Sequence, residues 1–155
     1  MKTINTYSIA GMILLTVTLF NCGGAGENTD QKQPEVVVPT DPFADWQKNI
    51  GVGPIKSINL AAIDNTMAAE GQVIFEAKCT ACHKTEKRFI GPAVKGVLDR
   101  RTAEWTMNMI LNPDQMVQKD PMAKQLLIDF NGSPMANQNL SEDEARAVLE
   151  YFRTL

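Results

Sequence analysis

The run Cys79-Thr80-Ala81-Cys82-His83 constrains this chain more than any other feature of its sequence. Two cysteines separated by two residues and followed directly by histidine form the attachment pattern of c-type haem, in which each thiol becomes a thioether. His83 is the only histidine among the 155 residues, so it can supply one axial nitrogen to iron and no second histidine can supply the other. The opposite axial position is left to a methionine, a lysine or no protein ligand.

Other interpretations of the motif are weaker. A zinc site usually needs four protein ligands, and the only further cysteine is Cys22, near the N-terminus. A thioredoxin-like motif lies in a βαβ unit, and no strand pattern surrounds residues 79–82. Two incidental cysteines at a helix end are the remaining alternative. The motif therefore predicts one covalently bound haem c.

Residues 1–22 have the features of a bacterial export signal. Lys2 supplies a positive start, and residues 9–20 form an apolar stretch of signal-peptide length that is short for a membrane span. Cys22 follows, with Leu19 three positions before it. This arrangement resembles a lipoprotein signal and makes Cys22 the candidate lipidation site, with ordinary cleavage as the alternative. Both predict a location on the periplasmic side of a bacterial membrane, where bacteria attach c-type haem.

Composition divides the remaining chain into three parts. Residues 23–42 are rich in Gly, Asn, Gln, Asp and Pro, which predicts a flexible linker because such a segment cannot bury a core. Residues 43–62 hold several apolar side chains around a Gly-Val-Gly-Pro turn, and we expect this extension to pack on the surface of the domain, with a role as a partner-docking strap as the alternative. The domain itself is expected at residues 63–155. The net charge of −3 gives no basic surface for nucleic acid.

Helical periodicity dominates the domain, and no convincing strand or hairpin pattern is present, which predicts an all-α fold. Four helix starts are expected, at Thr66, Thr102, Asp120-Pro121 and Ser141, from their capping residues. The second helix must stop before Pro113. Gly132 suits the C-terminal cap of the third.

Several short patterns recur in the order found in one known family. They are Gly71, Phe75 and Cys79 in the first helix, the loop Gly91-Pro92-Ala93-Val94-Lys95-Gly96, Asn112-Pro113, and Tyr151-Phe152 in the last helix. Together they make residues 64–155 similar to a class I c-type cytochrome, of the monohaem bacterial kind. The resemblance implies the cytochrome c fold, with several helices packed around one covalently bound haem.

The resemblance also implies the axial ligands. The carbonyl of Pro92 would accept a hydrogen bond from His83, which orients the ring and makes it a better donor to iron. Met135, in the loop before the last helix, would be the sixth ligand, and its neutral thioether favours ferrous iron. Met116 and Met122 lie near loops and are its rivals. Met107 and Met109 lie within a helix and are expected in the core.

Polar residues near the expected haem complete the set of candidates. Arg100, Arg101 and Trp105 are candidates for holding the haem propionates, since buried carboxylates require charge-assisted partners. Ordinary surface positions are the alternative for the two arginines. Asn137 and Gln138 are candidates for a hydrogen bond near the Met135 sulfur or a propionate.

A haem closed by His and Met has no open site for substrate, so the resemblance implies an electron carrier rather than an enzyme. The expected donors and acceptors are redox proteins: a quinol-oxidising complex, and a terminal oxidase or periplasmic nitrogen-oxide reductase. Cations near the motif, and acids at the start of the last helix, would steer such partners, or would be ordinary solvated charge. They are Lys84, Lys87, Arg88, Lys95, Arg100 and Arg101, and Glu142, Asp143 and Glu144. A haem-based sensor with a weak or open sixth site is the alternative, and a peroxidase a poorer third.

Overall fold

The computed structural model of this protein describes residues 41 and 43–155. The expected signal peptide (1–22), Cys22 and all of the expected linker (23–42) except Asp41 lie outside the described residues. Within residues 43–155 the regular elements are all helices, which confirms the all-α class. No helix in this part of the chain is long and apolar enough to cross a membrane.

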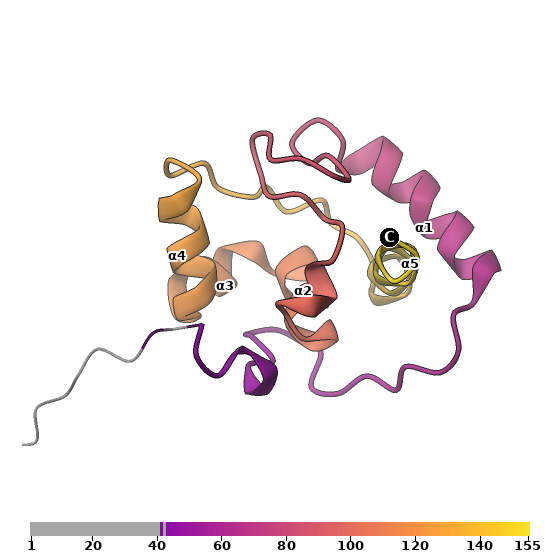
Figure 1. Ribbon diagram of the computed structural model, residues 1–155, viewed down its shortest axis with the longest axis horizontal. Helices are drawn as coiled ribbons and strands as arrows, with labels where there is room; N and C mark the ends of the chain where they lie inside the picture. The colour runs from indigo at the N-terminus through magenta and orange to yellow at the C-terminus, as the bar shows by residue number, and fades with distance from the viewer. Residues whose placement is uncertain (1–40, 42) are drawn as a thin grey trace, which may run out of the picture. The chain divides into compact units, whose positions relative to one another are not determined.

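Five α-helices and two 3-10 turns follow one another along the described chain (Figure 1). They are η1 (Trp46–Lys48), α1 (Asn65–Lys78), η2 (Val97–Asp99), α2 (Ala103–Leu111), α3 (Pro113–Lys119), α4 (Pro121–Asp129) and α5 (Glu142–Phe152). In space α1 packs on α5, α5 on α2, α2 on α3, and α3 on α4. The longest helix pair therefore lies at one end of the described domain, and the short helices α3 and α4 lie at the other (Figure 1).

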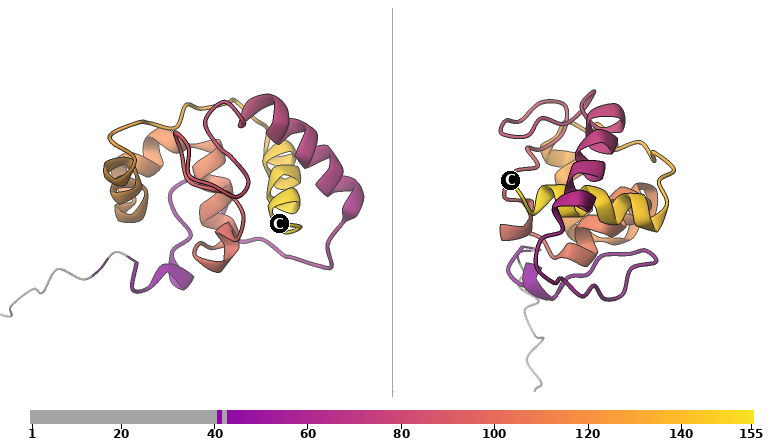
Figure 2. Two further views of the ribbon diagram at one scale, coloured as in Figure 1. Left: turned by 45° about the horizontal axis from the view of Figure 1, so that its top comes forward. Right: turned by 90° about the vertical axis from the view of Figure 1, so that its right-hand side faces the viewer.

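The crossing of α1 and α5 is the most extensive helix contact in this part of the protein, and Figure 2 shows the two helices crossing. A Cβ atom at Gly71 would lie 1.9 Å from the carbonyl oxygen of Ala147, so only glycine permits the backbones to approach this closely. Phe75, one turn further along α1, packs edge-on against Phe152 with ring centroids 5.6 Å apart. Both rings are buried, and their contact fixes the end of α1 that leads into the cysteine motif.

A buried carboxylate fixes the other end of the same crossing. Glu150 in α5 is 0% exposed and forms ion pairs with Arg146 and, at 2.7 Å, with Arg153. Its Oε1 also accepts the backbone N–H of Asp64 at 2.8 Å. Burial alone would raise the pKa of Glu150, but the hydrogen bonds from Arg153, Asp64 and Arg146 together lower the pKa below its ordinary value.

The extension packs against α2, α3 and α4. Phe43, Trp46 and Val52 cover a second buried cluster, formed by Trp105, Met116, Met122 and Ala123. Fully buried Asn108 in α2 anchors the extension by three hydrogen bonds. Its side-chain NH2 donates to the carbonyls of Ile50 and Ile55, and its side-chain oxygen accepts the N–H of Ile55. The extension is therefore an integral part of this side of the domain.

Two expected caps are wrong by one or two residues. The N-cap of α1 is Asp64 rather than Thr66, because the Asp64 carboxylate accepts the N–H groups of Thr66 and Met67. At the end of α4 the first left-handed residue is Asn131 (φ 58°), and Gly132 follows it with its N–H bonded to the carbonyl of Leu127. The caps expected at Thr102, Asp120 and Ser141 are present, the last as a complete capping box.

One helix was not expected. Pro113 was expected only to end the helix before it, whereas in the structure α3 begins at that residue. Proline at the first helical position loses no hydrogen bond, because that N–H has no partner inside a helix. The same residue therefore ends α2 and starts α3.

Candidate haem site

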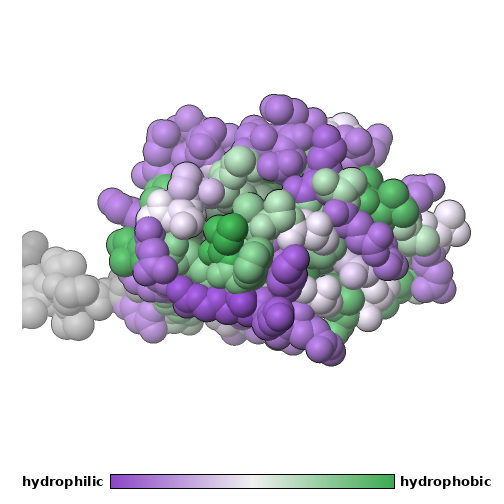
Figure 3. Space-filling view, turned by 90° about the horizontal axis from the view of Figure 1, so that it is seen from above, coloured by the Kyte–Doolittle hydropathy of each residue, from purple (hydrophilic) through white to green (hydrophobic). Residues whose placement is uncertain are grey.

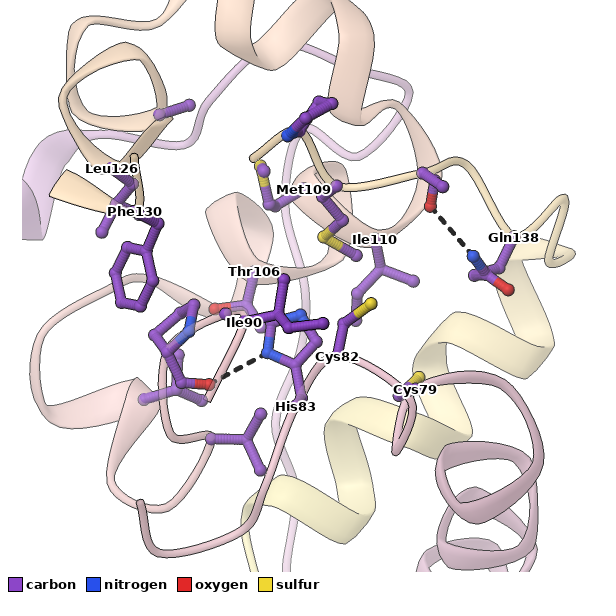
Figure 4. Close-up of a pocket in the computed structure, with 18 of the residues that line it drawn as sticks. Cys79, Cys82, His83, Ile90, Thr106, Met109, Ile110, Leu126, Phe130 and Gln138 are labelled. Atoms are coloured by element: carbon purple, nitrogen blue, oxygen red, sulfur yellow. Dashed lines mark hydrogen bonds between the residues drawn. The ribbon is translucent and has the colours of Figure 1, made fainter. Parts of the chain in front are cut away.

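The cysteine motif forms one tight turn at the end of α1. The N–H of Cys79 still bonds to the carbonyl of Phe75, and the N–H groups of Cys82 and His83 both bond to the carbonyl of Cys79, at 3.0 and 2.8 Å. This turn presents the two thiols and the imidazole to a single cavity (Figure 4). The two cysteines are not joined by a disulfide. Burial, with a smaller contribution from Cys82, raises the pKa of the Cys79 thiol to about 11.

His83 is oriented by the loop that follows it. Its Nδ1 donates to the carbonyl oxygen of Pro92 at 2.9 Å, the contact that the family resemblance implied, and Nε2 is left as the acceptor nitrogen. Gly91 lies directly against the ring, since a Cβ there would be 2.5 Å from Cε1 of His83. The N–H of Gly91 bonds to the carbonyl of Cys82. The loop therefore fixes both the tautomer and the plane of the imidazole.

The rest of the cavity wall is mostly apolar. Its larger side chains come from α1, α2, α4, α5 and the loops between them: Phe75, Ile90, Trp105, Met109, Ile110, Leu126, Leu127, Phe130, Leu140 and Phe152. Figure 3 shows hydrophobic residues gathered in a hollow that hydrophilic residues border. Two thiols at one edge, an oriented imidazole and an apolar wall are the donor set and surroundings that a covalently attached haem requires.

Met135 lines this cavity together with His83. Its proposed rivals do not, since Met116 and Met122 are both 0% exposed and lie in the cluster beneath the extension. The sulfur of Met116 accepts the N–H of Val52 at 2.9 Å, and that of Met122 accepts the Asn49 amide at 3.2 Å. Met109 was expected in the core but is a cavity residue.

The expected propionate partners are placed differently from one another. Arg100 donates to the carbonyls of Ala93, Lys95 and Gly96 and stands outside the cavity lining, so it braces the loop around His83. Arg101 is buried beside the rings of Phe43 and Trp105. Its burial and the positive charge of Arg100 lower its pKa, and the attraction of Asp120 opposes this shift only in part.

Trp105 lines the cavity with its ring, but its Nε1–H donates to the buried carboxylate of Asp120 at 3.0 Å. The ring can therefore contact a haem, whereas its one donor is already bonded. Asp120 also accepts the Asn49 amide at 2.7 Å, which links the extension to this wall. Sequence reasoning identified Asp120 only as a helix cap, and nothing in the sequence pairs it with Trp105.

Of the polar residues near Met135, Gln138 lines the cavity and Asn137 stands outside the lining. The Gln138 amide donates to the carbonyl of Ala136 at 3.2 Å (Figure 4). The Asn137 amide donates to the carbonyl of Leu111 at 3.5 Å. Both contacts shape the loop that carries Met135.

The helical fold and this site define a protein built around one covalently attached haem, and comparisons with known proteins agree. The model of the family described as Cytochrome c matches residues 68–155, more than half of the chain. The chain therefore belongs to the cytochrome c family, as a class I c-type cytochrome with one covalent haem c. No curated protein matches its sequence.

Solved structures give the same result. A cytochrome c from Rhodothermus marinus is 43% identical, with a TM-score of 0.65, and the match covers 74% of this chain and 96% of that one. An engineered form of that cytochrome, bound to a carbene intermediate, matches with the same identity and coverage and a TM-score of 0.62. The chain is thus similar to these proteins over almost their whole length, and it is a haem electron carrier.

Proposed function

We propose that this protein carries single electrons on the periplasmic side of a bacterial membrane, with His83 and Met135 as the axial ligands of its haem. When bound, the haem supplies an iron that takes up and releases one electron. The chain contributes an imidazole oriented by Pro92, a thioether from Met135 and an apolar wall that keeps water away. The observation that carries the proposal is that His83 and Met135 line one cavity.

Cys22 is the proposed lipid attachment site, and the evidence for it is the sequence alone. The test is to express the full chain in a bacterium that assembles c-type cytochromes and to separate membrane and soluble periplasmic fractions. The haem protein should sediment with membranes, and Cys22→Ser should release it into the soluble periplasm. A wild-type protein found in the soluble fraction would contradict the lipid anchor and leave the electron-carrier role intact.

The proposed partners are a quinol-oxidising complex as donor, and a terminal oxidase or periplasmic nitrogen-oxide reductase as acceptor. Support comes from the loop after the motif, where Phe89 is half exposed and lies outside the cavity lining. Lys84 lies over the Phe89 ring, with 5.0 Å from its Nζ to the centroid, and Arg88 lies over Phe130. Exposed apolar surface bordered by cations suits a weak, transient contact with an acidic redox partner.

Stopped-flow oxidation by each candidate acceptor tests this choice. The second-order rate constant should fall with ionic strength, because attraction between the cationic loop and an acidic partner is screened by salt. Lys84→Gln and Arg88→Gln should lower it, while Lys56→Gln, on the extension, serves as the matched control. A rate constant that is independent of salt and of these variants would contradict docking at this loop.

The axial ligands are tested by absorption spectra of the oxidised and reduced protein. A far-red Met-to-ferric charge-transfer band is expected in the wild type, together with slow or absent CO binding to the reduced form. A high-spin ferric spectrum with ready CO binding would instead favour a haem-based sensor.

A further inference from the structure

Two methionines, rather than one, line the cavity that holds His83: Met135 and Met109. Both are half-buried. In contrast, three other methionines are buried in the two hydrophobic clusters: Met107 is 2% exposed, and Met116 and Met122 are each 0% exposed. The cavity therefore offers two thioethers for the one axial position that His83 leaves open.

Met109 belongs to the face of α2 that forms the cavity wall. Trp105, Thr106, Met109 and Ile110 all line the cavity, and their spacing places them on one side of a helix. Met107, two positions away, turns to the core between α2 and α5. In Figure 4 the Met109 side chain reaches from α2 towards the ring of His83.

The two methionines differ in how firmly the chain holds them. The helix of Met109 is capped by Thr102, whose side chain accepts the N–H of Trp105 at 3.0 Å, and is anchored by the three hydrogen bonds of buried Asn108. Met135 lies in a largely exposed loop. A side chain of this loop, Asn137, donates a hydrogen bond to α2, and that contact is long at 3.5 Å. Met135 and Leu140 pack at the edge of the hydrophobic cluster between α1, α2 and α5, but a loop with so few hydrogen bonds opens locally at a lower free energy than a buried helix.

We infer that Met109 is a reserve axial ligand, which replaces Met135 when the loop carrying it moves away. The inference rests on the proposed assignment of Met135 as the first ligand. The exchange breaks one bond between iron and the Met135 sulfur and forms one to the Met109 sulfur. Both thioethers are neutral, so no proton or electron is transferred. The Met109 side chain is unbranched and flexible, so its sulfur can move to the axial position that Met135 leaves.

The consequence is protection of the iron. A reserve thioether keeps the haem low-spin while the loop is open, and it competes with small ligands such as CO. Electron transfer then continues through loop openings that would otherwise expose an open coordination site.

The test compares Met135→Ala, Met109→Leu and the double variant as mature haem proteins. Met135→Ala should stay low-spin with a Met-to-ferric band, and the double variant should become high-spin. CO affinity of the reduced double variant should exceed that of Met135→Ala by about tenfold or more, since no thioether competes. Met107→Leu, the same change on the opposite face of α2, is the control and should leave both readouts unchanged.

NMR of protein labelled with ¹³C at the methionine methyl groups gives a second readout that does not depend on activity. In reduced Met135→Ala one methyl signal should show the large ring-current shift of a haem ligand, and Met109→Leu should remove it. A Met135→Ala protein that is already high-spin would overturn the inference while leaving the proposed function in place.

Two other results would also overturn it. A low-spin Met135→Ala spectrum without the Met band would indicate a lysine ligand, with Lys78 as the candidate because it lines the cavity. A wild-type band that is lost in Met109→Leu and kept in Met135→Ala would make Met109 the first ligand, which contradicts the proposed assignment of Met135 as well.

Discussion

The segment that carries His83 (residues 79–100, the proximal segment) and the segment that carries Met135 (residues 131–140, the distal segment) line the same cavity but are held differently. Hydrogen bonds join distant parts of the proximal segment. The backbone N–H groups of Val94 and Lys95 donate to the carbonyls of Lys84 and Thr85, and the Arg100 side chain donates three further hydrogen bonds to backbone carbonyls. The distal segment has few bonds, and most of them join close neighbours in its own chain. The difference is consistent with the two proposals made above, a permanent ligand at His83 and an exchangeable one at Met135.

Covalent attachment through Cys79 and Cys82 should contribute most to holding the haem on the proximal segment. In Cys79→Ala/Cys82→Ala no thioether can form, so we expect acidified organic solvent to extract all pigment from the chain. Met135→Ala should keep its pigment under the same treatment. Pigment that stays with the double cysteine variant would contradict attachment at this motif.

The buried ion-pair network at the crossing of α1 and α5 should have the next largest effect, on the stability of the fold. Glu150→Gln leaves Arg146 and Arg153 without their carboxylate and weakens the anchor at Asp64. Because both arginine side chains are partly exposed, we expect a loss of about 1–3 kcal/mol, which denaturant unfolding of the haem protein can measure. Glu142→Gln, exposed on the same helix, is the control and should change stability by less than about 0.5 kcal/mol.

The same network predicts a dependence of stability on pH. The pKa of Glu150 is lower in the folded protein than in the unfolded chain, so its carboxylate stabilises the fold at neutral pH and loses this effect as the pH falls through the lowered pKa. The stability difference between wild type and Glu150→Gln should therefore shrink on acidification. A difference that stays constant from pH 7 downward through the acidic range would contradict this account.

Gly91 tests how closely the proximal segment is fitted to His83. A Cβ at Gly91 would lie 2.5 Å from Cε1 and 2.9 Å from Nδ1 of the ring, so Gly91→Ala should cost about 1–3 kcal/mol and shift the reduction potential by turning the imidazole.

Gly132→Ala is the distal counterpart. Its Cβ meets nothing within 4 Å, but its φ of +71° is strained for alanine, which costs about 1–2 kcal/mol. It should lower stability without changing the reduction potential. Equal shifts of the reduction potential in both variants would remove the distinction between the two segments.

The smallest effect is expected at Asn137. Its 3.5 Å contact with the Leu111 carbonyl is long for a hydrogen bond, so Asn137→Ala should change global stability by less than about 0.5 kcal/mol. Arg100→Ala in the proximal segment removes three charge-assisted bonds and should cost roughly 1.5–3 kcal/mol. A similar loss in the two variants, measured by denaturant unfolding, would show that the distal segment is held as firmly as the proximal one.

The features that sequence reasoning found are those set by neighbours in the chain. The cysteine motif, the turn at Gly91-Pro92 and the capping box at Ser141 each depend on residues within a few positions of one another. In contrast, Asp120 accepts hydrogen bonds from Trp105, 15 positions away, and from Asn49, 71 positions away. No local sequence pattern predicts these contacts.

The place of Met109 illustrates a second reason. Both faces of α2 are largely apolar, because one packs on the core and the other on the haem cavity. Periodicity separates buried from exposed positions, but it does not separate protein core from cofactor wall. Met107 and Met109 are therefore equivalent in the sequence and different in the structure.

The extension also has a consequence for the order in which the molecule assembles. Its anchoring bonds join residues far apart in the chain, such as Ile55 with Asn108, 53 positions away, and Asn49 with Met122, 73 positions away. Bringing such distant residues together costs more chain entropy than closing the four-residue turn at the cysteine motif. We expect the turn at the cysteine motif to form first and the extension to dock on α2, α3 and α4 last, so the attachment site is built before the molecule is complete.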